Sequence, residues 1–519
     1  MASPTAQPPA LAIDEASAEP AYQQIARQLR RSIETGDRSP GERLPAIRTL
    51  AGELGVHRDT VALAYESLGD EGWVEARVGA GTFVRSTVVS WAEAARQGEA
   101  SAPAAIEGRS DEREVELALA PPVERLITLE NLRPRYAPDG ETVALHRLIP
   151  DPRFYPIDEF RACVDAALRE EGAELFSYAS PEGDPELRRV MSERFGLFGI
   201  RHAAEEHVLC HGASQGISLA LRLFTQPGDQ IAVEVPTYAN VLSAFAGLGV
   251  SAAPVAMDED GADPASLDRV LAKPEVKAFY TIPSFHNPLG TSTSLARRKQ
   301  ILAIAERHGV PIIEDGFELD LRFRGEEIPP LAALDEAGIV VLLFSFSKSL
   351  FPGVRVGSLS ARGRVLEGLV ALKHATDLSD AMLLQAGLTR FVRSGGYDRH
   401  LARIRKVLRS RHAALEEALA KSMPSGTRWT SPDGGYQLWV ELPDEIDTRD
   451  LLPEAARAGV LFSPGTLFMP DARPSNALRL TVAASTEDEI ARGVAALGDV
   501  VRRSGESRRA QRRRPGNHL

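Results

Sequence analysis

The stretch SFSKSLFPGVRVG, residues 345–357, directly follows the apolar run IVVLLF, residues 339–344. A short apolar run rich in β-branched residues predicts a buried strand, and Lys348 stands just beyond its end. A buried ammonium group is unfavourable unless it meets a partner. The polar side chains that accompany Lys348 in this stretch are Ser345, Ser347 and Arg355. The stretch therefore predicts a ligand site at the carboxyl end of a strand.

The composition is that of an ordinary globular protein, 43% hydrophobic and 25% charged, and 519 residues are too many for one core. The formal net charge of −12 means that any DNA-binding part must be local. The two cysteines, Cys163 and Cys210, are too few for a disulfide framework and fit a reducing cytosol. The sequence has neither a secretory signal nor an apolar stretch long enough to span a membrane. We therefore expect a cytoplasmic protein of two or three domains with no membrane partner.

The patterning divides the chain into five segments. Residues 1–20 are rich in Ala and Pro, and we expect them to be disordered. Residues 21–86 are compact and strongly patterned, whereas residues 87–140 have weak periodicity and predict a linker. Residues 141–500 alternate helical patterns with short apolar runs, which is typical of an α/β domain with a mostly parallel sheet. Residues 501–519 predict a disordered arginine-rich tail, with added non-specific DNA affinity as the alternative.

The segment 21–86 carries the pattern of three short helices and a hairpin. Apolar residues recur at helical spacing in three stretches, which end near Gly36, Gly55 and Gly72. Two helices joined by a short turn with glycine predict a helix-turn-helix. The stretch WVEARVGAGTFV, residues 73–84, then predicts two short strands that form a wing.

A winged helix of this kind places the first turn of its third helix in the major groove of DNA. The residues expected to contact DNA are Arg58, Asp59 and Thr60 at the base edges, Arg43, Arg48 and Arg77 at phosphates or the flanking groove, and Gly79 in the wing. Nine arginines and nine acidic residues between residues 21 and 85 give a net charge of zero, which is less basic than most DNA-binding domains. A module that binds something other than DNA is therefore the alternative interpretation.

The stretch GERLPAIRTLAGELGVHRDTVALAYESLGDEGWV, residues 41–74, closely resembles the GntR-type winged helix-turn-helix. The resemblance implies binding to double-stranded DNA at a promoter or operator. It favours the DNA-binding interpretation over the alternative.

Four further motifs place polar residues after predicted strands of the large domain. LCHGASQGISLAL, residues 209–221, has a turn with glycine before a helix whose free amides favour a phosphate. The other three motifs, VEVPTYANVL, FYTIPSFHNPLGTS and VPIIEDGFELD, end their strands near Tyr238, Asn287 and Asp315. Ligands of doubly wound sheets bind at the carboxyl ends of the strands, so we expect these side chains to meet Lys348.

One aromatic ligand, pyridoxal 5′-phosphate, accounts for all of these groups. Its aldehyde would condense with Lys348, its pyridinium N–H would pair with Asp315, and its phenolate would accept a hydrogen bond from Asn287. Tyr238 would cover the ring. The groups expected to hold its phosphate are Ser345, Ser347, Arg355 and the amides of Ala213 and Ser214. A single lysine, aspartate or tyrosine in such a position usually has only a structural role. The presence of all these residues at strand ends is what predicts the cofactor.

Residues from about 145 to 500 resemble the fold-type I aminotransferases of the aspartate aminotransferase superfamily. The resemblance implies a large α/β domain and a smaller α+β subdomain at about residues 380–500. YASPEGDPELR resembles the segment whose tyrosine, here Tyr178, reaches the cofactor phosphate of the other subunit. SNALRLTVA resembles the segment whose arginine, here Arg479, binds a substrate carboxylate. Both roles imply a homodimer with shared sites, in which domains could be swapped.

A GntR-type winged helix followed by a linker and such a domain resembles the MocR/GabR family of transcriptional regulators. The resemblance implies a large domain that senses an amino compound, or pyridoxal phosphate itself, through the aldimine of Lys348. An active class I/II aminotransferase with an auxiliary winged helix is the alternative, and a regulator that has lost the cofactor is a third reading.

Two departures from the family patterns bear on activity and ligand. Phe317 stands where the family usually has a tyrosine that donates to the phenolic oxygen of the cofactor, so we do not expect efficient transamination. The stretch PTYAN, residues 236–240, lacks the second carboxylate-binding arginine of the GABA-sensing members, so GABA is not the expected effector.

The histidines do not have the spacing of metal ligands, and we expect no metal site. The histidines considered were His202, His207, His211 and His286.

Overall fold

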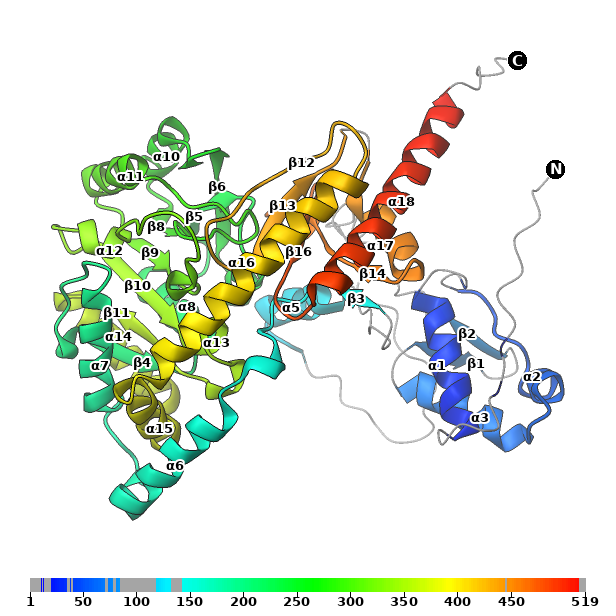
Figure 1. The fold of residues 1–519 in the computed structure, drawn as a ribbon, viewed down its shortest axis with the longest axis horizontal. Helices are drawn as coiled ribbons and strands as arrows, with labels where there is room; N and C mark the ends of the chain where they lie inside the picture. The colour runs from blue at the N-terminus through cyan, green and yellow to red at the C-terminus, as the bar shows by residue number, and fades with distance from the viewer. Residues whose placement is uncertain are drawn as a thin grey trace.

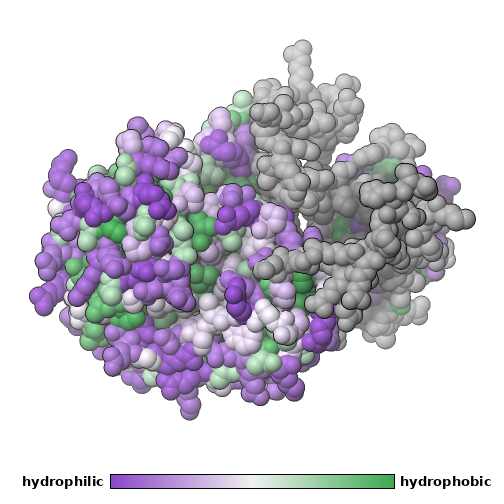
Figure 2. All heavy atoms as spheres, turned by 90° about the horizontal axis from the view of Figure 1, so that it is seen from above, coloured by the Kyte–Doolittle hydropathy of each residue, from purple (hydrophilic) through white to green (hydrophobic). Residues whose placement is uncertain are grey.

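The computed structural model describes residues 20–34, 41–70, 73–77, 81–84, 118–131, 142–443 and 446–512, together with Leu11, Ile13 and Arg38. Figure 1 shows a small N-terminal unit in blue, a sheet flanked by helices in green, and long C-terminal helices in yellow and red. Within the described residues, no helix is both long and apolar enough to cross a membrane. The coloured part of the face in Figure 2 is mostly hydrophilic, with hydrophobic residues in small separate areas.

The N-terminal unit has the three helices and the hairpin that the sequence predicts. Its elements are α1 (Ala21–Glu34), α2 (Ile47–Leu54), α3 (Arg58–Asp70), β1 (Val74–Arg77) and β2 (Gly81–Val84). Ile25 and Leu29 of α1 are fully buried against Val61 and its neighbours on α3. Helix α2 ends at Gly55, whose φ of 68° lies in the left-handed region that glycine adopts readily. The two strands pair antiparallel, so the prediction of a winged helix-turn-helix is confirmed.

The large domain is built on an eight-stranded sheet with the order β4-β11-β10-β9-β8-β5-β6-β7. The strands are β4 (His207–Cys210), β5 (Gln230–Val235), β6 (Ser251–Asp258), β7 (Gly261–Ala262), β8 (Val276–Thr281), β9 (Ile312–Asp315), β10 (Val340–Ser345) and β11 (Gly357–Ser360). Strands β10, β9, β8, β5 and β6 are parallel neighbours, whereas β11 is antiparallel to both β10 and β4. The mostly parallel sheet that the sequence predicts is therefore confirmed.

Helices cover both faces of this sheet (Figure 1). They are α6 (Ile157–Glu171), α7 (Pro185–Gly196), α8 (Ala213–Phe224), α9 (Ala239–Leu248), α10 (Pro264–Leu271), α11 (Leu295–His308), α12 (Leu331–Leu334), α13 (Phe346–Ser349), α14 (Gly363–Asp377) and α15 (Met382–Arg393). Successive strand residues point to opposite faces. Leu343 therefore joins the core beneath α8 and α14, while Leu342 and Phe344 join the larger core on the other face.

The C-terminal part of the chain forms a smaller antiparallel sheet with long helices. Its sheet has the order β12-β13-β16-β15, from β12 (Arg428–Trp429), β13 (Gln437–Glu441), β15 (Ser463–Pro464) and β16 (Ala477–Thr481). Its helices are α16 (Gly396–Ser422), α17 (Thr448–Arg457) and α18 (Glu487–Arg512). Helices α16 and α18 lie side by side (Figure 1).

Two segments contain more helix than the sequence patterns predict. Helix α5 (Pro121–Asn131) lies inside the predicted linker 87–140 and packs on α9, where Leu126 faces Gly247. Helix α18 continues to Arg512, so residues 501–512 of the predicted disordered tail are helical. Leu126 of α5 is half-buried against α9, and α18 continues from the buried residues Val500 and Val501. Packing of this kind is a tertiary effect, which the local sequence pattern does not reveal. The predicted disorder of residues 1–20 lies almost wholly outside the described residues.

A segment that we call the strap, residues 143–151, leads into the large domain and crosses to the C-terminal sheet. Its strand β3 (Val143–Ala144) pairs in parallel with β14 (Val460–Leu461). The carbonyls of Leu145 and Arg147 accept hydrogen bonds from the backbone and side chain of Thr481 at 2.8 Å each. The strap is therefore fixed to β16, the strand that carries Arg479.

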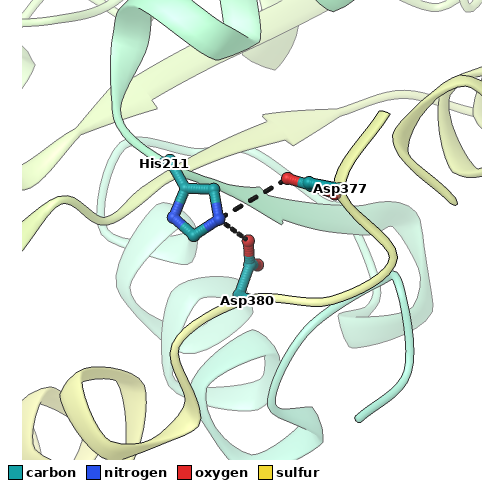
Figure 3. A group of neighbouring side chains, drawn as sticks. All are labelled: His211, Asp377 and Asp380. Atoms are coloured by element: carbon teal, nitrogen blue, oxygen red, sulfur yellow. Dashed lines mark ion pairs between the residues drawn. The ribbon is translucent and has the colours of Figure 1, made fainter. Parts of the chain in front are cut away.

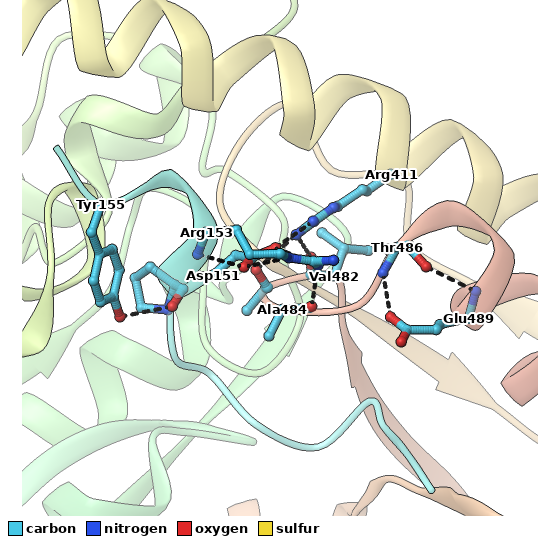
Figure 4. A network of polar contacts seen from close by, with 10 residues as sticks. Asp151, Arg153, Tyr155, Arg411, Val482, Ala484, Thr486 and Glu489 are labelled. Atoms are coloured by element: carbon cyan, nitrogen blue, oxygen red, sulfur yellow. Dashed lines mark hydrogen bonds and ion pairs between the residues drawn. The ribbon is translucent and has the colours of Figure 1, made fainter. Parts of the chain in front are cut away.

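A charge cluster around the buried pair Asp151 and Arg411 holds the far end of the strap (Figure 4). The Asp151 carboxylate accepts from Arg411 on α16 at 2.6 Å and from Arg153 at 2.6 Å. Arg411 also donates to the carbonyls of Val482 and Ala483. Burial opposes ionisation of Asp151, but the hydrogen bonds from the two arginines outweigh it and keep its pKa below the ordinary value.

We expect Asp151→Asn to lower the free energy of unfolding by about 3 kcal/mol at pH 7, because it leaves the Arg411 guanidinium buried without its counter-charge. Since the pKa of Asp151 is depressed in the folded state, this contribution is complete above an unfolded pKa of about 4 and is lost as the pH falls through the folded value. Urea denaturation at pH 7 and below pH 4 measures both effects. Asp158→Asn is the matched control, because the Asp158 side chain is 85% exposed. Equal midpoints for the two variants at pH 7 would contradict the assignment.

Candidate cofactor-binding site

The carboxyl ends of five strands lie along one edge of the large sheet. Strands β10, β9, β8 and β5 run parallel, and β4 runs in the same direction because β11 is antiparallel to both β4 and β10. Leu343 of β10 pairs with Asp315, the last residue of β9. The segments that follow these strands carry the predicted residues, so the structure brings together what the sequence scatters over more than a hundred positions.

Lys348 lies on the single-turn helix α13 that follows β10. The Ser345 hydroxyl caps this helix by accepting from the amide of Ser347 at 3.2 Å. The Lys348 ammonium donates to the carbonyl of Leu148 in the strap, and the Tyr436 hydroxyl donates to the Lys348 carbonyl at 2.8 Å. Burial lowers the pKa of Lys348, which favours the neutral amine needed for attack on an aldehyde.

Asp315 is buried at the end of the neighbouring strand. Its carboxylate accepts from the Tyr280 hydroxyl at 2.6 Å and from the Phe317 amide at 3.2 Å. Burial raises the pKa of Asp315 to about 6, although these hydrogen bonds oppose the shift. No cation of the described residues forms an ion pair with Asp315. A buried acid of this kind fits a ligand that brings a positively charged N–H.

The turn between β4 and α8 forms a cradle with free amides. Gly212 precedes α8 with a φ of 78°, and a Cβ at this position would lie 3.1 Å from the Arg355 guanidinium. Arg355 donates to the His211 carbonyl. The Ser347 hydroxyl is buried and has no partner among the described residues. A helix N-terminus, a guanidinium and an orphaned hydroxyl suit a phosphate.

A charge network around His211, which precedes Gly212, lies next to this cradle (Figure 3). The His211 imidazole lies 3.2 Å from Asp380 and 3.5 Å from Asp377, and its amide donates to Gln215, which in turn donates to Asp377. The buried Lys373 ammonium already donates to both carboxylates, at 2.9 and 2.7 Å. The three residues could hold a metal ion by position, but with Lys373 in place they form an ion-pair network. The sequence did not indicate it, because Asp377 and Asp380 lie far from His211 along the chain.

Arg479 is buried beside the strap, and among the described residues its hydrogen bonds go only to neutral groups. It donates to Asn287 Oδ1 at 2.9 Å, to the His146 carbonyl at 2.9 Å and to the Ser463 hydroxyl at 3.2 Å. Its Nε is buried without a partner in the described part of the chain. Burial lowers the pKa of Arg479 to about 10, although Tyr238 and Glu318 oppose the shift. A buried guanidinium without a counter-ion fits a ligand carboxylate.

The comparisons with known proteins agree with this geometry. The family model described as aminotransferase class I and II matches residues 154–497. The chain belongs to this family. The model for bacterial regulatory proteins of the gntR family matches residues 21–84, so this aminotransferase-family protein carries a GntR winged helix in front of its large domain.

Two relatives match this chain over most of their length. The protein is 29% identical over 481 residues to the HTH-type transcriptional regulator YdcR of Escherichia coli, covering 92% of this chain and 98% of the relative. It is 28% identical over 457 residues to the probable rhizopine catabolism regulatory protein MocR of Rhizobium meliloti, covering 88% of each. The predicted MocR-type organisation is therefore confirmed.

The fold also matches a solved enzyme with a bound cofactor adduct. LysN, the α-aminoadipate aminotransferase of Thermus thermophilus complexed with N-(5′-phosphopyridoxyl)-L-leucine, superposes with a TM-score of 0.67 at 30% identity, over 75% of this chain and 96% of that one. Together with the class I and II family match, it assigns pyridoxal 5′-phosphate as the cofactor. Asp315, the cradle and Lys348 fit this cofactor by burial and charge.

Several residues that the sequence singles out are half-buried, exposed or part of the core. Tyr238 is half-buried at the start of α9 and packs against the same core as Phe317. Phe317 is itself buried, so its ring fills core space. Tyr178 is 85% exposed, and Ser214 and Arg355 are exposed as well.

The predicted DNA-contacting residues occupy exposed positions of the winged helix where they are described. Arg43, Arg48, Arg58 and Asp59 are exposed and Thr60 is half-buried. Asp59 accepts from the Arg58 side chain at 3.2 Å, which holds the two side chains at the start of α3. The Arg77 side chain and Gly79 lie outside the described residues.

Sequence reasoning missed two parts of the site. Glu318, three positions after Asp315, is buried, and its charge opposes the lowering of the Lys348 pKa by burial. The strap supplies the carbonyls of His146 and Leu148 to Arg479 and Lys348. Glu318 could have been noticed as a second acid after a buried strand, whereas nothing in the strap sequence points to backbone contacts.

We expect Gly212→Ala to weaken binding of pyridoxal 5′-phosphate about tenfold, because the new methyl group would push the Arg355 guanidinium out of the cradle, and hydrogen bonds to charged groups contribute about 1.5–3 kcal/mol. Absorbance titration of the cofactor measures the change. Gly228→Ala is the matched control, since Gly228 also has a positive φ, of 98°, but has nothing within 4 Å of an added Cβ. An equal loss of affinity in both variants would assign the effect to backbone strain.

Proposed function

We propose that this protein is a pyridoxal 5′-phosphate-dependent, DNA-binding transcriptional regulator whose large domain senses an amino compound or the cofactor itself. One observation carries the proposal. The strap follows the DNA-binding unit and precedes the large domain in the chain, and its carbonyls accept hydrogen bonds from Lys348 and Arg479. A ligand that occupies these two residues must therefore displace the segment that leads back to the winged helix.

Different residues of the site would bind different parts of the cofactor. When bound, pyridoxal 5′-phosphate supplies an aldehyde that condenses with primary amines. Lys348 would provide the amine for this bond, and Asp315 would supply the negative charge that favours a protonated ring nitrogen. The residues that would hold the phosphate are Ala213, Ser214, Ser347 and Arg355, with Ser345 capping the turn. Asn287 has its amide nitrogen available for the phenolic oxygen, because its carbonyl oxygen accepts from Arg479.

Arg479 selects effectors that carry a carboxylate. The His146 carbonyl and the Asn287 amide oxygen are neutral acceptors, and a carboxylate forms stronger, charge-assisted hydrogen bonds with a guanidinium. An amino acid would place its carboxylate at Arg479 and its amine near Lys348, and so break both contacts of the strap. The difference in affinity between the strapped and the displaced arrangement is what would change DNA binding.

Tyr178 supports a homodimer with shared sites. A tyrosine that is 85% exposed, next to Phe176 at 73% exposure, is unusual for a monomer surface. Ser214 and Arg355 at the cradle are also exposed, so Tyr178 of the partner subunit could complete the phosphate site. As a DNA-binding protein of the GntR type, the dimer would act in the cytoplasm.

A working aminotransferase is the second candidate function. The observation in its favour is that burial lowers the pKa of Lys348, as a proton-transferring lysine requires. The buried ring of Phe317 offers no hydroxyl donor, which favours ligand exchange over efficient turnover. Sustained conversion of an amino acid and keto acid pair, at about one per second or faster, would support the enzyme and argue against a pure sensor.

The decisive experiment measures binding to a promoter fragment from the protein's own gene region, with and without pyridoxal 5′-phosphate and a panel of amino acids. We expect ligands to change DNA affinity at least fivefold in the wild type. Lys348→Ala should still bind DNA, lose the visible absorbance band of lysine-bound cofactor and lose the ligand response. No binding by the wild type at low salt, or an unchanged ligand response in Lys348→Ala, would overturn the proposal.

Arg48→Ala should weaken DNA binding to the same degree for all sequences and reduce the slope of log affinity against log salt by about one, as loss of one phosphate contact does. Fluorescence anisotropy at several salt concentrations measures the slope. Arg364→Ala is the matched control, because Arg364 is 94% exposed on α14 of the large domain. An unchanged slope in Arg48→Ala would remove this residue from the DNA interface.

A further inference from the structure

The helix that carries Lys348, α13, is too short to set its own direction. It has four residues, which make a single turn, and helices of this length are not stable in water without outside contacts. Strand β10 leads into it through the Ser345 cap, and the helix ends at Leu350, whose φ of −127° and ψ of −88° are not helical. The direction of the Lys348 side chain therefore depends on what packs against this turn.

Tyr436 contacts the main chain of Lys348 directly. It is 2% exposed and precedes β13 in the C-terminal sheet. Its hydroxyl donates to the Lys348 carbonyl at 2.8 Å, and its own carbonyl accepts from the Val482 amide at 2.8 Å. The last carbonyls of a helix have no partner within the helix. Tyr436 supplies a donor to one of them and so joins α13 to the C-terminal sheet.

Tyr397 contacts both ends of the same turn. It is fully buried in the first turn of α16. Its hydroxyl lies 2.6 Å from the Ser349 hydroxyl, and its ring packs edge-on against Phe346 with 5.3 Å between the ring centroids. Phe346 and Ser349 are the first and last residues of α13, and residues three apart lie on one face of a helix. Tyr397 therefore restrains the turn along one whole face.

A buried ion pair fixes the Tyr397 hydroxyl. The hydroxyl also lies 2.6 Å from the Asp320 carboxylate, which accepts from Arg194 at 2.7 Å. The Arg194 guanidinium lies 4.4 Å from the centroid of the Tyr397 ring. Burial raises the pKa of Tyr397 and of Tyr436 well above the ordinary value, so both hydroxyls keep their protons at neutral pH. The position of the Tyr397 hydroxyl is therefore set by groups outside α13.

We propose that Tyr397 and Tyr436 are positioning residues, which set the direction of the Lys348 amine by fixing α13. The inference rests on the proposed role of Lys348 as the residue that bonds to the cofactor. Both tyrosines act through the turn, because their hydroxyls contact the Ser349 side chain and the Lys348 carbonyl. Helix α16 also carries Arg411, which donates to a carboxylate at the far end of the strap. The same helix thus helps to fix both the lysine and the segment whose carbonyl accepts from it.

The test compares two ligands that differ only at the group that reacts with Lys348. Pyridoxal 5′-phosphate carries an aldehyde, whereas pyridoxine 5′-phosphate carries an alcohol in its place and cannot condense with an amine. Calorimetric titration of the full-length protein measures both affinities. Tyr436→Phe and Tyr397→Phe keep each ring and remove its hydroxyl, so we expect each to weaken pyridoxal 5′-phosphate binding about fivefold. Affinity for pyridoxine 5′-phosphate should stay within about twofold of the wild type.

Two further variants sharpen the test. Ser349→Ala removes one partner of the Tyr397 hydroxyl and leaves its contact with Asp320 intact. Because Ser349→Ala and Tyr397→Phe delete the same contact, the double variant should lose no more affinity than the weaker-binding single variant. Tyr65→Phe is the matched control, since the Tyr65 hydroxyl donates to the Pro45 carbonyl at 2.7 Å in the winged unit, and it should change neither affinity.

The proposal is overturned if either phenylalanine variant binds pyridoxal 5′-phosphate like the wild type. It is also overturned if affinity for pyridoxine 5′-phosphate falls equally, because the tyrosines would then stabilise the domain as a whole and not the lysine. A wild type that binds neither ligand would overturn the proposed function and this inference with it. Wild-type binding with unaltered variants would overturn this inference alone, so the two failures are distinguishable.

Discussion

The site depends on holding a half-buried positive side chain and a buried negative side chain beyond the ends of two adjacent strands, with no ion pair between them. Lys348 follows β10 and Asp315 ends β9, and in the described part of the chain no ion pair connects the two. Burying ionisable groups in this way costs free energy that only a ligand with complementary charges recovers. The parallel sheet supplies the rigidity, because strand ends that share a hydrogen-bonded ladder cannot relax independently. A cofactor that spans both groups therefore stabilises the folded domain as well as the site.

Under the proposed function, the strap is the part of the chain that responds to a ligand. Backbone carbonyls satisfy the donors of Lys348 and Arg479 well enough to keep the site closed, but they carry no charge and bind a cation less strongly than a carboxylate does. Because the strap carbonyls bind Lys348 and Arg479 only moderately well, a ligand that binds slightly better would shift the equilibrium from the strapped to the displaced arrangement. The buried pair of Asp151 and Arg411 fixes the other end of the strap.

Local sequence patterns predict much of the fold and several residues of the site. Lys348 and Asp315 could be predicted because each ends an apolar run, where an ionisable residue is conspicuous. The three helices of the winged unit could be placed because apolar spacing and terminal glycines agree. In contrast, α5 was missed since its stability comes from α9, and the residues 501–512 were misjudged because arginines are good helix formers once the preceding turns are packed. The backbone contacts of the strap involve carbonyls, which every residue has, so no sequence pattern marks them.

The winged helix has no net positive charge, so strong DNA binding would depend on the large domain holding two such units together. Nine arginines and nine acidic residues between residues 21 and 85 leave little non-specific attraction to phosphates. A single winged helix of this kind would bind weakly, and two of them linked by a dimer would gain affinity through their effective concentration at the second half-site. That gain depends on how far apart the two units are held and not on new contacts with DNA. A ligand that moves the strap would therefore regulate binding without touching the DNA interface, which is how a site built for amino-group chemistry can control a promoter.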